Sequence, residues 1–267
     1  MTFGRPMNAP GAPAETAAAE VHRFTASDGV ELAWREVGQG RTVVLLHGLF
    51  SDANTNWIKF GHAEAIAAKG FRVVMPDLRA HGLSDKPHEA DRYPRGVLAR
   101  DCRELIAHLG LDDFDLGGFS LGARTVVQVV GEGERPRRAI LGGMGLEGLS
   151  DWNRRQAFFH EAIAQFDIAK RGDRWWMAIQ FMKTMKVDRV AAGHLLRTFE
   201  DAHPEWLDAF AKPTLVVCGD RDQDNGSAPD LAAALPNAEL ELVPGTHMSS
   251  VTEPSFGTAI ASFVAAP

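Results

Sequence analysis

The sequence is poor in cysteine and tyrosine, with two cysteines, Cys102 and Cys218, and one tyrosine among 267 residues. The two cysteines are 116 positions apart, which is not the spacing of a metal site. Each falls in a predicted helix or strand, so we expect buried, unpaired thiols. Such cysteine usage fits a reducing compartment and predicts a cytoplasmic protein.

The sequence also has no surplus of positive charge and no long apolar run. The net charge is −7, which argues against nucleic acid as the main partner because phosphate contacts need clustered Lys and Arg. The one tight basic cluster, Arg135, Arg137 and Arg138, is interpreted as a solvated loop. No run approaches the roughly 18 apolar residues of a membrane span. The first 20 residues have no apolar core of a signal peptide, and their Ala, Pro and Gly content predicts a flexible tail.

The remaining composition is that of a globular protein, 45% hydrophobic and 24% charged, and strands alternate with helices along it. A hairpin comes first, and continuous apolar runs such as "TVVLLHG" then predict strands that are buried on both faces. Residues 21–146 and 212–267 follow this rhythm and predict an α/β core with a mostly parallel, doubly wound sheet. Residues 147–211 lack strand signals and predict an inserted helical cap.

The stretch "LGGFSLGAR" places Ser120 between a predicted strand and a predicted helix, with Gly118 and Gly122 two residues to either side. A Ser on such a turn can have an exposed Oγ, as in a nucleophile elbow. A plain structural turn is the alternative. In a parallel sheet this position lies at the carboxyl ends of the strands, where binding sites form.

A nucleophilic Ser needs a base, and the base needs an orienting carboxylate. Ten histidines are present, but His247 follows the last predicted strand at the same edge of the sheet as Ser120. The strand before it ends in "GDRDQDN", which offers Asp220, Asp222 and Asp224. Loop carboxylates also cap turns, so the chemistry leaves the choice among them open. We predict a Ser-Asp-His order, which is hard to obtain by chance on a βα scaffold.

Four motifs resemble those of the α/β-hydrolase fold family: "LLHGLF", "PDLRAHGLSD", "GGFSLGA", and "CGDRD" with "PGTH". The resemblance covers residues 21–264 outside the insertion. It selects Asp222 as the acid, with Asp224, Glu147 and Asp151 as alternatives. Two departures are Ala80, where the family has Gly, and Thr246, where a Gly usually precedes the final His.

The resemblance implies a serine hydrolase that needs no cofactor and no metal. The N–H of Leu121 is expected to be one oxyanion donor, and the family pattern makes the N–H of Leu49 the second. A Ser at the elbow argues against haloalkane dehalogenase and epoxide hydrolase chemistry, since members with those activities carry Asp there. In "SDANTNW" we expect Asp52, Asn54 or Asn56 to cap a helix, with substrate contact as the alternative.

The predicted cap is rich in Trp, Phe and Met, which suits a hydrophobic roof over an apolar substrate. We predict that Phe50 lines the acyl pocket and that at least one of Trp175 and Trp176 faces it. The expected substrate is a small to medium apolar ester, thioester or lactone. Alternatives are C–C bond hydrolysis, amide hydrolysis or perhydrolysis on the same triad, and a receptor-like protein that binds without catalysis.

Overall fold

A computed structural model describes residues 19–150 and 152–267, and these residues form one eight-stranded sheet with the order β1-β2-β4-β3-β5-β6-β7-β8. The pairs β1–β2 and β2–β4 are antiparallel, whereas every pair from β4 to β8 is parallel. The sheet confirms the predicted fold class. Its strands are Val21–Thr25 (β1), Glu31–Gly38 (β2), Arg41–Leu46 (β3), Phe71–Pro76 (β4), Phe114–Phe119 (β5), Ala139–Gly142 (β6), Thr214–Gly219 (β7) and Ala238–Val243 (β8).

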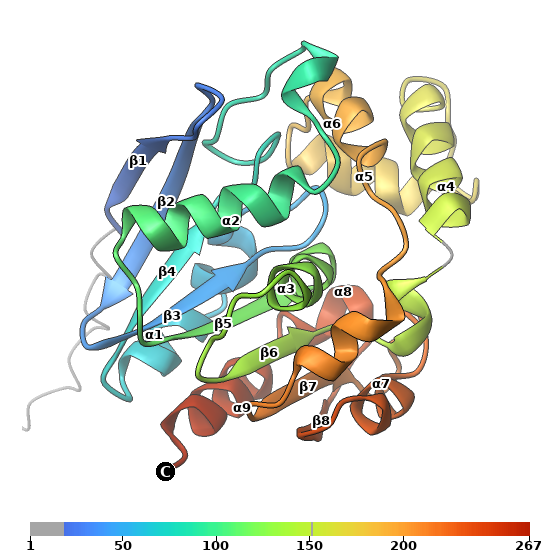
Figure 1. The fold of residues 1–267 in the computed structure, drawn as a ribbon. Helices are drawn as coiled ribbons and strands as arrows, with labels where there is room; N and C mark the ends of the chain where they lie inside the picture. Colours follow the sequence, from blue (N-terminus) through green and yellow to red (C-terminus); the bar gives the residue numbers. More distant parts are fainter. Residues whose placement is uncertain (1–18, 151) are drawn as a thin grey trace, which may run out of the picture.

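Helices cover both faces of the sheet (Figure 1), which explains why the central strands are apolar throughout. In β3, Val44 and Leu46 pack into the cluster under α2 and α3, while Val43 and Leu45 pack toward α1 and α9. The covering helices are His62–Ala67 (α1), Val97–His108 (α2), Leu121–Gly131 (α3), Ala228–Ala234 (α7) and Pro254–Ala265 (α9).

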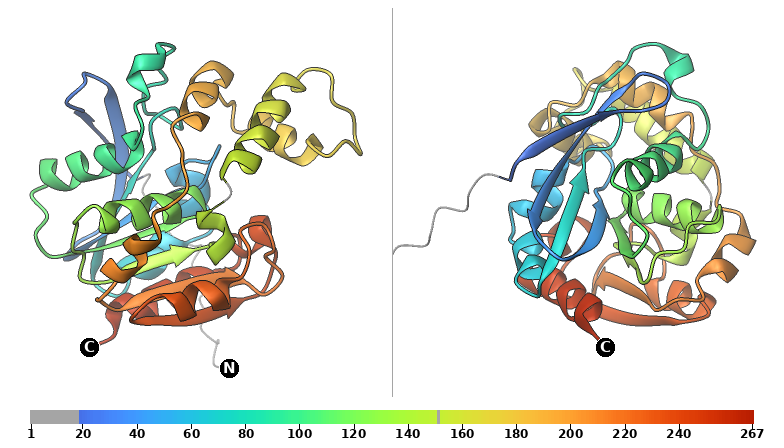
Figure 2. Two further views of the ribbon diagram at one scale, coloured as in Figure 1. Left: turned by 45° about the vertical axis from the view of Figure 1, so that its right-hand side comes forward. Right: turned by 60° about the vertical axis from the view of Figure 1, so that its left-hand side comes forward.

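Between β6 and β7 the described chain is helical, and α4, α5 and α6 group together above the sheet (Figure 2). Their apolar side chains form a third cluster that also contains Phe50 of the core. The bounds of 147–211 for a separate cap stay a prediction. The helices are Trp152–Ala164 (α4), Trp176–Thr184 (α5) and Arg189–Leu196 (α6), with short turns at Leu146–Leu149 (η3) and Pro204–Ala209 (η4).

The basic cluster near residue 138 corrects one prediction. Arg135 and Arg137 are exposed, but Arg138 is buried and donates hydrogen bonds to the carbonyls of Ala266 and Pro267. Arg138 therefore fastens the end of the chain to the start of β6 and is not part of a solvated loop. The sequence could not show this, because the carbonyl partners lie about 130 residues away.

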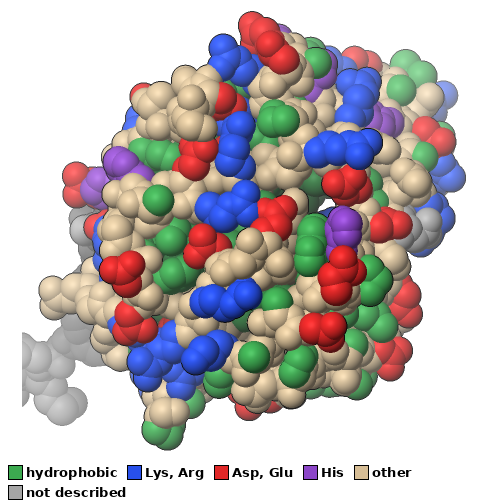
Figure 3. Space-filling view, viewed as in Figure 1, with side chains coloured by type: hydrophobic (Ala, Val, Ile, Leu, Met, Phe, Trp, Pro, Cys, Tyr) green, Lys and Arg blue, Asp and Glu red, His purple; other side chains and the backbone are tan. Residues whose placement is uncertain are grey.

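The other structural predictions concern the cysteines, the tail and the membrane. Cys102 and Cys218 are buried and free, as expected. The predicted tail, residues 1–20, lies outside the described residues except for its last two positions. No helix within 19–150 and 152–267 has the length and apolarity to cross a bilayer. On the face in Figure 3, acidic and basic side chains are interspersed and form no large patch of one sign.

Candidate active site

Ser120 stands at the tight turn from β5 into α3. Its backbone has φ 53° and ψ −110°, a strained conformation for a residue with a side chain. Gly118 packs against the backbone of Gly122, and Gly122 in turn packs against the carbonyl of Leu46, so neither position has room for a Cβ. The N–H of Leu121, first in α3, has no partner within the helix. The glycines are thus required for strand and helix to close beneath Ser120.

Ser120, His247 and Asp222 form one chain of hydrogen bonds. Nε2 of His247 lies 3.0 Å from Oγ of Ser120, and Nδ1 lies 2.8 Å from Oδ2 of Asp222. The imidazole stacks on the ring of Phe119 with centroids 4.9 Å apart. These contacts orient the imidazole so that Nδ1–H donates to the carboxylate and Nε2 accepts from the hydroxyl. Such an arrangement can take a proton from Ser120.

Asp222 is buried and held by several donors. Its Oδ1 accepts from the N–H of Asp224 at 3.0 Å, and its Oδ2 accepts from the thiol of Cys218 at 3.5 Å as well as from His247. Burial by itself would raise the pKa of Asp222, but the hydrogen bond and charge of His247 hold it below its usual value. Asp222 is therefore a carboxylate at neutral pH.

The alternative acids lie elsewhere. Asp224 is exposed on the loop beyond Asp222. The carboxylate of Glu147 accepts from the N–H of Ser227 and ties η3 to the loop before α7. Asp151 lies outside the described residues. Of the carboxylates whose position is described, Asp222 is the one paired with His247.

Thr246, one of the two departures from the family pattern, has a local explanation. His247 begins the short helix α8 (His247–Ser250), and Thr246 caps it reciprocally with Ser249. The backbone of Thr246 is extended, and the positive φ of this turn falls on Gly245 instead. The N–H of Gly245 donates to Asp220, so the first Asp of the "GDRD" motif supports the loop that carries His247.

The loop after β3, which lies beside the elbow, has one unpaired N–H among the described residues. The N–H of Gly48 donates to Oδ1 of Asn56 at 3.0 Å, and the N–H of Phe50 donates to Nε2 of His81 at 3.0 Å. Between them, the N–H of Leu49 has no acceptor among the described residues. A Cβ on Gly48 would lie 3.5 Å from that of Ser120. The loop thus keeps one donor free beside the hydroxyl.

Two buried histidines hold this loop. His47 accepts from the N–H of Leu78 through Nε2 and donates from Nδ1 to the carbonyl of Gly48. His81 likewise accepts from Phe50 through Nε2 and donates from Nδ1 to the carbonyl of Arg79. Burial lowers the pKa of both imidazoles, that of His81 to about 3. They stay neutral, so each retains the one donor and one acceptor that its position requires.

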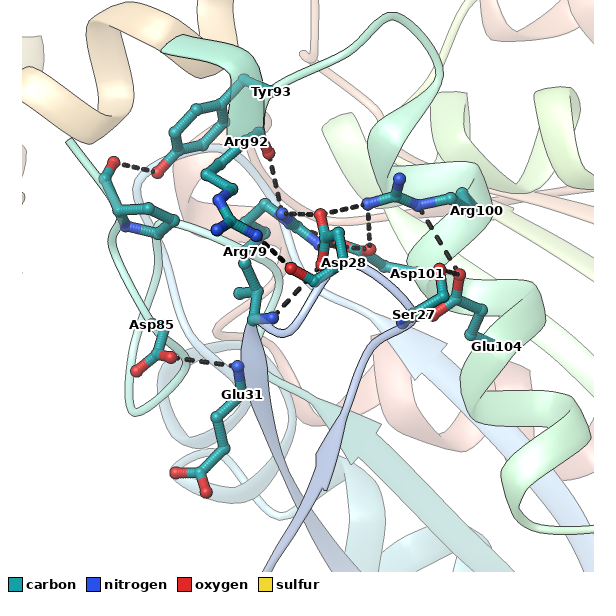
Figure 4. Close-up of polar contacts among 12 residues, drawn as sticks. Ser27, Asp28, Glu31, Arg79, Asp85, Arg92, Tyr93, Arg100, Asp101 and Glu104 are labelled. Atoms are coloured by element: carbon teal, nitrogen blue, oxygen red, sulfur yellow. Dashed lines mark hydrogen bonds and ion pairs between the residues drawn. The ribbon is translucent and has the colours of Figure 1, made fainter. Parts of the chain in front are cut away.

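An ion network centred on Arg79, two residues before His81, fixes the loop after β4 (Figure 4). The guanidinium of Arg79, which is fully buried, contacts Asp101 on α2 at 2.8 Å and Asp28 of the β1–β2 turn at 2.7 Å. Arg100 also contacts Asp28, at 2.6 Å. Burial alone would raise the pKa of Asp28, but the hydrogen bonds from Arg79 and Arg100 hold it well below its usual value. The network therefore connects the outer hairpin to the backbone that positions His81.

Polar residues after Phe50 accept hydrogen bonds from nearby backbone N–H groups. Asp52 accepts from the N–H of Thr55 at the start of the turn Asn54–Ile58 (η1), as predicted for a cap. Asn56 is buried and holds Gly48, a role that the sequence did not reveal. The feature of the sequence that could have indicated this role is the position of Asn56, a polar residue directly before Trp57, which is buried. The supporting roles of His47, His81 and Cys218 were likewise missed.

The predicted pocket residues lie in or near the apolar cluster of the cap. Phe50 is buried and meets Phe159 of α4 edge to face, with centroids 5.5 Å apart. Trp175 packs against the same cluster and donates from Nε1 to Glu161 at 3.2 Å. Trp176 begins α5 and is half-buried. Phe50 thus joins the loop after β3 to the underside of the cap.

Known proteins resemble this chain over nearly its whole length. Residues 41–173 match the family model described as alpha/beta hydrolase fold. A non-heme haloperoxidase of Rhodococcus erythropolis is 27% identical, covering 90% of this chain and 98% of its own. A non-heme chloroperoxidase of Kitasatospora aureofaciens is 29% identical, covering 83% and 90%. An esterase of Exiguobacterium antarcticum superposes with a TM-score of 0.75 at 20% identity, covering 91% and 99%.

Proposed function

Because this chain belongs to the α/β-hydrolase fold family, we propose that it is a serine hydrolase. Its substrate class is a small to medium apolar ester, thioester or lactone. The observation that carries the proposal is the chain of contacts from Ser120 through His247 to Asp222, at 3.0 Å and 2.8 Å. Hydroxyl, imidazole and carboxylate in this order are the parts of a serine nucleophile.

In the proposed mechanism, Oγ of Ser120 attacks the carbonyl carbon while Nε2 of His247 takes the hydroxyl proton. Asp222 stabilises the imidazolium that forms. The tetrahedral intermediate collapses, and the leaving group departs with the proton from His247. Water then attacks the acyl-enzyme, again with His247 as base, and releases the acid and free Ser120. No cofactor is needed for either half of the reaction.

The N–H groups of Leu49 and Leu121 are the proposed oxyanion donors. Support for Leu49 comes from its neighbours, because the N–H groups of Gly48 and Phe50 are engaged and that of Leu49 is not. Support for Leu121 comes from its place at the first turn of α3, where unpaired N–H groups and the helix dipole favour negative charge. Donors fixed in advance in this way stabilise the developing charge without reorganisation.

The apolar substrate preference rests on the cap. We assign Phe50, Trp175 and Trp176 to the roof and wall of the acyl pocket, because Phe50 and Trp175 belong to one apolar cluster between core and cap. Aromatic walls of this kind bind acyl chains or rings by burial of apolar area.

Labelling with a fluorophosphonate probe tests the proposal. We expect one adduct at Ser120, located by mass spectrometry, and neither labelling nor ester hydrolysis in Ser120→Ala. Loss of a triad member costs on the order of 10⁴- to 10⁶-fold in kcat. A Ser120→Ala protein that keeps more than about a tenth of the activity would refute the nucleophile. A folded wild-type protein that binds esters but is not labelled would be a receptor.

Perhydrolysis is a second candidate, favoured by the two relatives named as non-heme peroxidases. On the same triad, hydrogen peroxide would replace water as the attacker of the acyl-enzyme and release a peracid. Mixing the protein with acetate, peroxide and bromide, and following bromination of a dye, measures this route. Ser120→Ala should abolish it, since the route needs the same acyl-enzyme.

A further inference from the structure

A cavity lies between the cap and the core, with a volume of about 220 Å³. None of Ser120, His247 and Asp222 lines it. Its walls come from β2, from the loops after β3 and β4, and from the turn at residues 185–187 between α5 and α6. The proposed hydrolase function assigns a substrate contact to only one of its lining residues, Phe50.

The acidic side chains of this cavity are largely engaged by internal donors. Asp77 is fully buried and accepts from the N–H groups of Ala53 and Leu83, each at 2.8 Å, and from Arg35 at 3.3 Å. Asp52 is half-buried and uses one oxygen to accept from the N–H of Thr55. The other oxygen of Asp52 is the main acceptor that remains.

The basic side chains, in contrast, keep unused donors. Nζ of Lys86 donates to the carbonyls of Gly82 and Ser84, which leaves one of its three N–H groups. Arg35 has five N–H donors and contacts only Asp77 among the described residues. Lys186 is exposed and its side chain has no partner in the described part of the chain. The charges of Arg35 and Asp77 cancel. The remaining charged side chains of the lining are Lys86, Lys186 and Asp52, so two positive charges stand against one negative charge.

The carboxylates near Lys86 that do not line the cavity, Asp188 and Asp85, have hydrogen-bond partners of their own. Asp188 accepts from the N–H groups of Val190 and Ala191 and pairs with His88, while Asp85 accepts from the N–H of Glu31. Burial lowers the pKa of Lys86 even though Asp77, Asp188 and Asp85 favour its charged form. The ammonium of Lys86 is therefore incompletely solvated, and an anion in the cavity would stabilise its charge.

Apolar side chains complete the walls. Phe50, Leu83, Met185 and Val187 line the same space as the two lysines. A ligand with one charged end and a short apolar body matches both kinds of wall, whereas an inorganic anion would leave the apolar area unused.

We propose that this cavity binds a small organic acid, with its carboxylate between Lys86, Lys186 and Arg35 and its apolar body against Phe50 and Met185. The ligand would bridge the core and the α5–α6 turn of the cap. The acid could be the product of hydrolysis or an unrelated metabolite, but in either case it occupies this cavity and not the space at Ser120. Binding is independent of whether Ser120 is a nucleophile.

Isothermal titration of the full chain with hexanoate tests the site, with hexanamide as the uncharged match. We expect hexanoate to bind about tenfold more tightly than hexanamide or inorganic phosphate, and less tightly as NaCl is raised. Lys86→Met should weaken hexanoate binding about tenfold and the exposed Lys186→Met about threefold. Lys69→Met, an exposed lysine at the end of α1, is the matched control and should bind like wild type.

Three results would overturn the proposal: no binding of hexanoate, equal binding of hexanamide, or unchanged affinity in both cavity variants. The last would place the acid elsewhere, including at Ser120. Because Lys186 is exposed and its side chain makes no hydrogen bond or ion pair with the described residues, Lys186→Met keeps the test decisive even if Lys86→Met does not fold. Fluorophosphonate labelling of the same variants reports separately on the proposed nucleophile.

Discussion

Replacing Asp222 with Asn changes almost no volume but reverses the hydrogen bonding around His247. In the native site, Oδ1 of Asp222 accepts from the N–H of Asp224, and Oδ2 accepts from Nδ1–H of His247. An Asn has only one acceptor oxygen for these two donors. If its oxygen keeps the N–H of Asp224, its NH₂ group points at His247. Nδ1 must then accept, and the ring proton moves to Nε2, where it faces Ser120.

The opposite orientation of the Asn is worse. Its NH₂ group would meet the N–H of Asp224, and a buried donor would lose its acceptor, at a cost of about 1–3 kcal/mol. The variant therefore favours the tautomer that cannot take the proton of Ser120. For a Ser-His-Asp triad this change costs on the order of 10⁴ in kcat, or about 5.5 kcal/mol of transition-state stabilisation.

The assay is hydrolysis of p-nitrophenyl butyrate, with the melting temperature of each variant as a check of folding. Asp222→Asn should lose activity by that factor and remain folded. Asp224→Asn, two residues on and exposed, is the matched control and should stay within about threefold of wild type. Glu147→Gln should also stay within about threefold of wild type, because the carboxylate of Glu147 accepts a hydrogen bond from the N–H of Ser227. If Asp222→Asn keeps more than about a tenth of the activity, or a control loses more than it does, the assignment of the acid is wrong.

Four further substitutions test other parts of the structure. Burial raises the pKa of the Asp115 carboxyl to about 6, so the folded state retains a proton that the unfolded chain releases. The stability that Asp115 contributes should therefore fall by about 2 kcal/mol as pH rises from 4 to 6. Urea unfolding measures this as the difference between wild type and Asp115→Asn, because the buried neutral His81 titrates in the opposite sense in both proteins. Trp175→Ala should lower the melting temperature, because its ring packs in the cap cluster. Trp176→Ala should change relative kcat/KM along a p-nitrophenyl ester series by about 1–3 kcal/mol; an unchanged series for both would leave the pair a purely structural role. Gly122→Ala should destabilise the fold by about 1–3 kcal/mol in urea unfolding, since its Cβ meets the backbone of β3.

The alternation of apolar strands and helices predicted the sheet because each central strand is buried on both faces. The same logic predicted that Ser120, Asp222 and His247 would lie at one edge, since each follows a strand of a parallel sheet. That inference needed only the strand ends and the turn chemistry around them. Both are local properties of the sequence.

The supporting contacts could not be predicted in this way. Asn56 and His81 hold the N–H groups of Gly48 and Phe50 through loops that meet only in the folded chain. The sequence showed His81 before a Gly at a strand end but could not show which N–H it would accept. The role of Arg138 was misjudged for the same reason, because its partners are carbonyls at the far end of the chain.

The backbone strain of the described residues shows where these supports are needed. Four residues other than glycine have positive φ: Phe50, Ala80, Ser120 and Lys186. Replacing such a residue with glycine would relieve about 1 kcal/mol of backbone strain. Each of the four side chains, however, has a role that glycine would remove. The ring of Phe50 is buried, which stabilises by about 1.5–3 kcal/mol, and the buried methyl of Ala80 contributes about 0.8 kcal/mol. Ala80 thus costs almost nothing net, which accounts for its departure from the family's Gly.

The other two strained residues have side chains whose uses are chemical. The hydroxyl of Ser120 is the proposed nucleophile, and Lys186 lines the proposed carboxylate cavity, as do Phe50 and Ala80. Strained backbone persists where its surroundings hold it, and it gathers at functional sites. Here it gathers at the hydroxyl and around one cavity. Three of the four strained residues thus line the cavity that we proposed from its charges and its apolar walls.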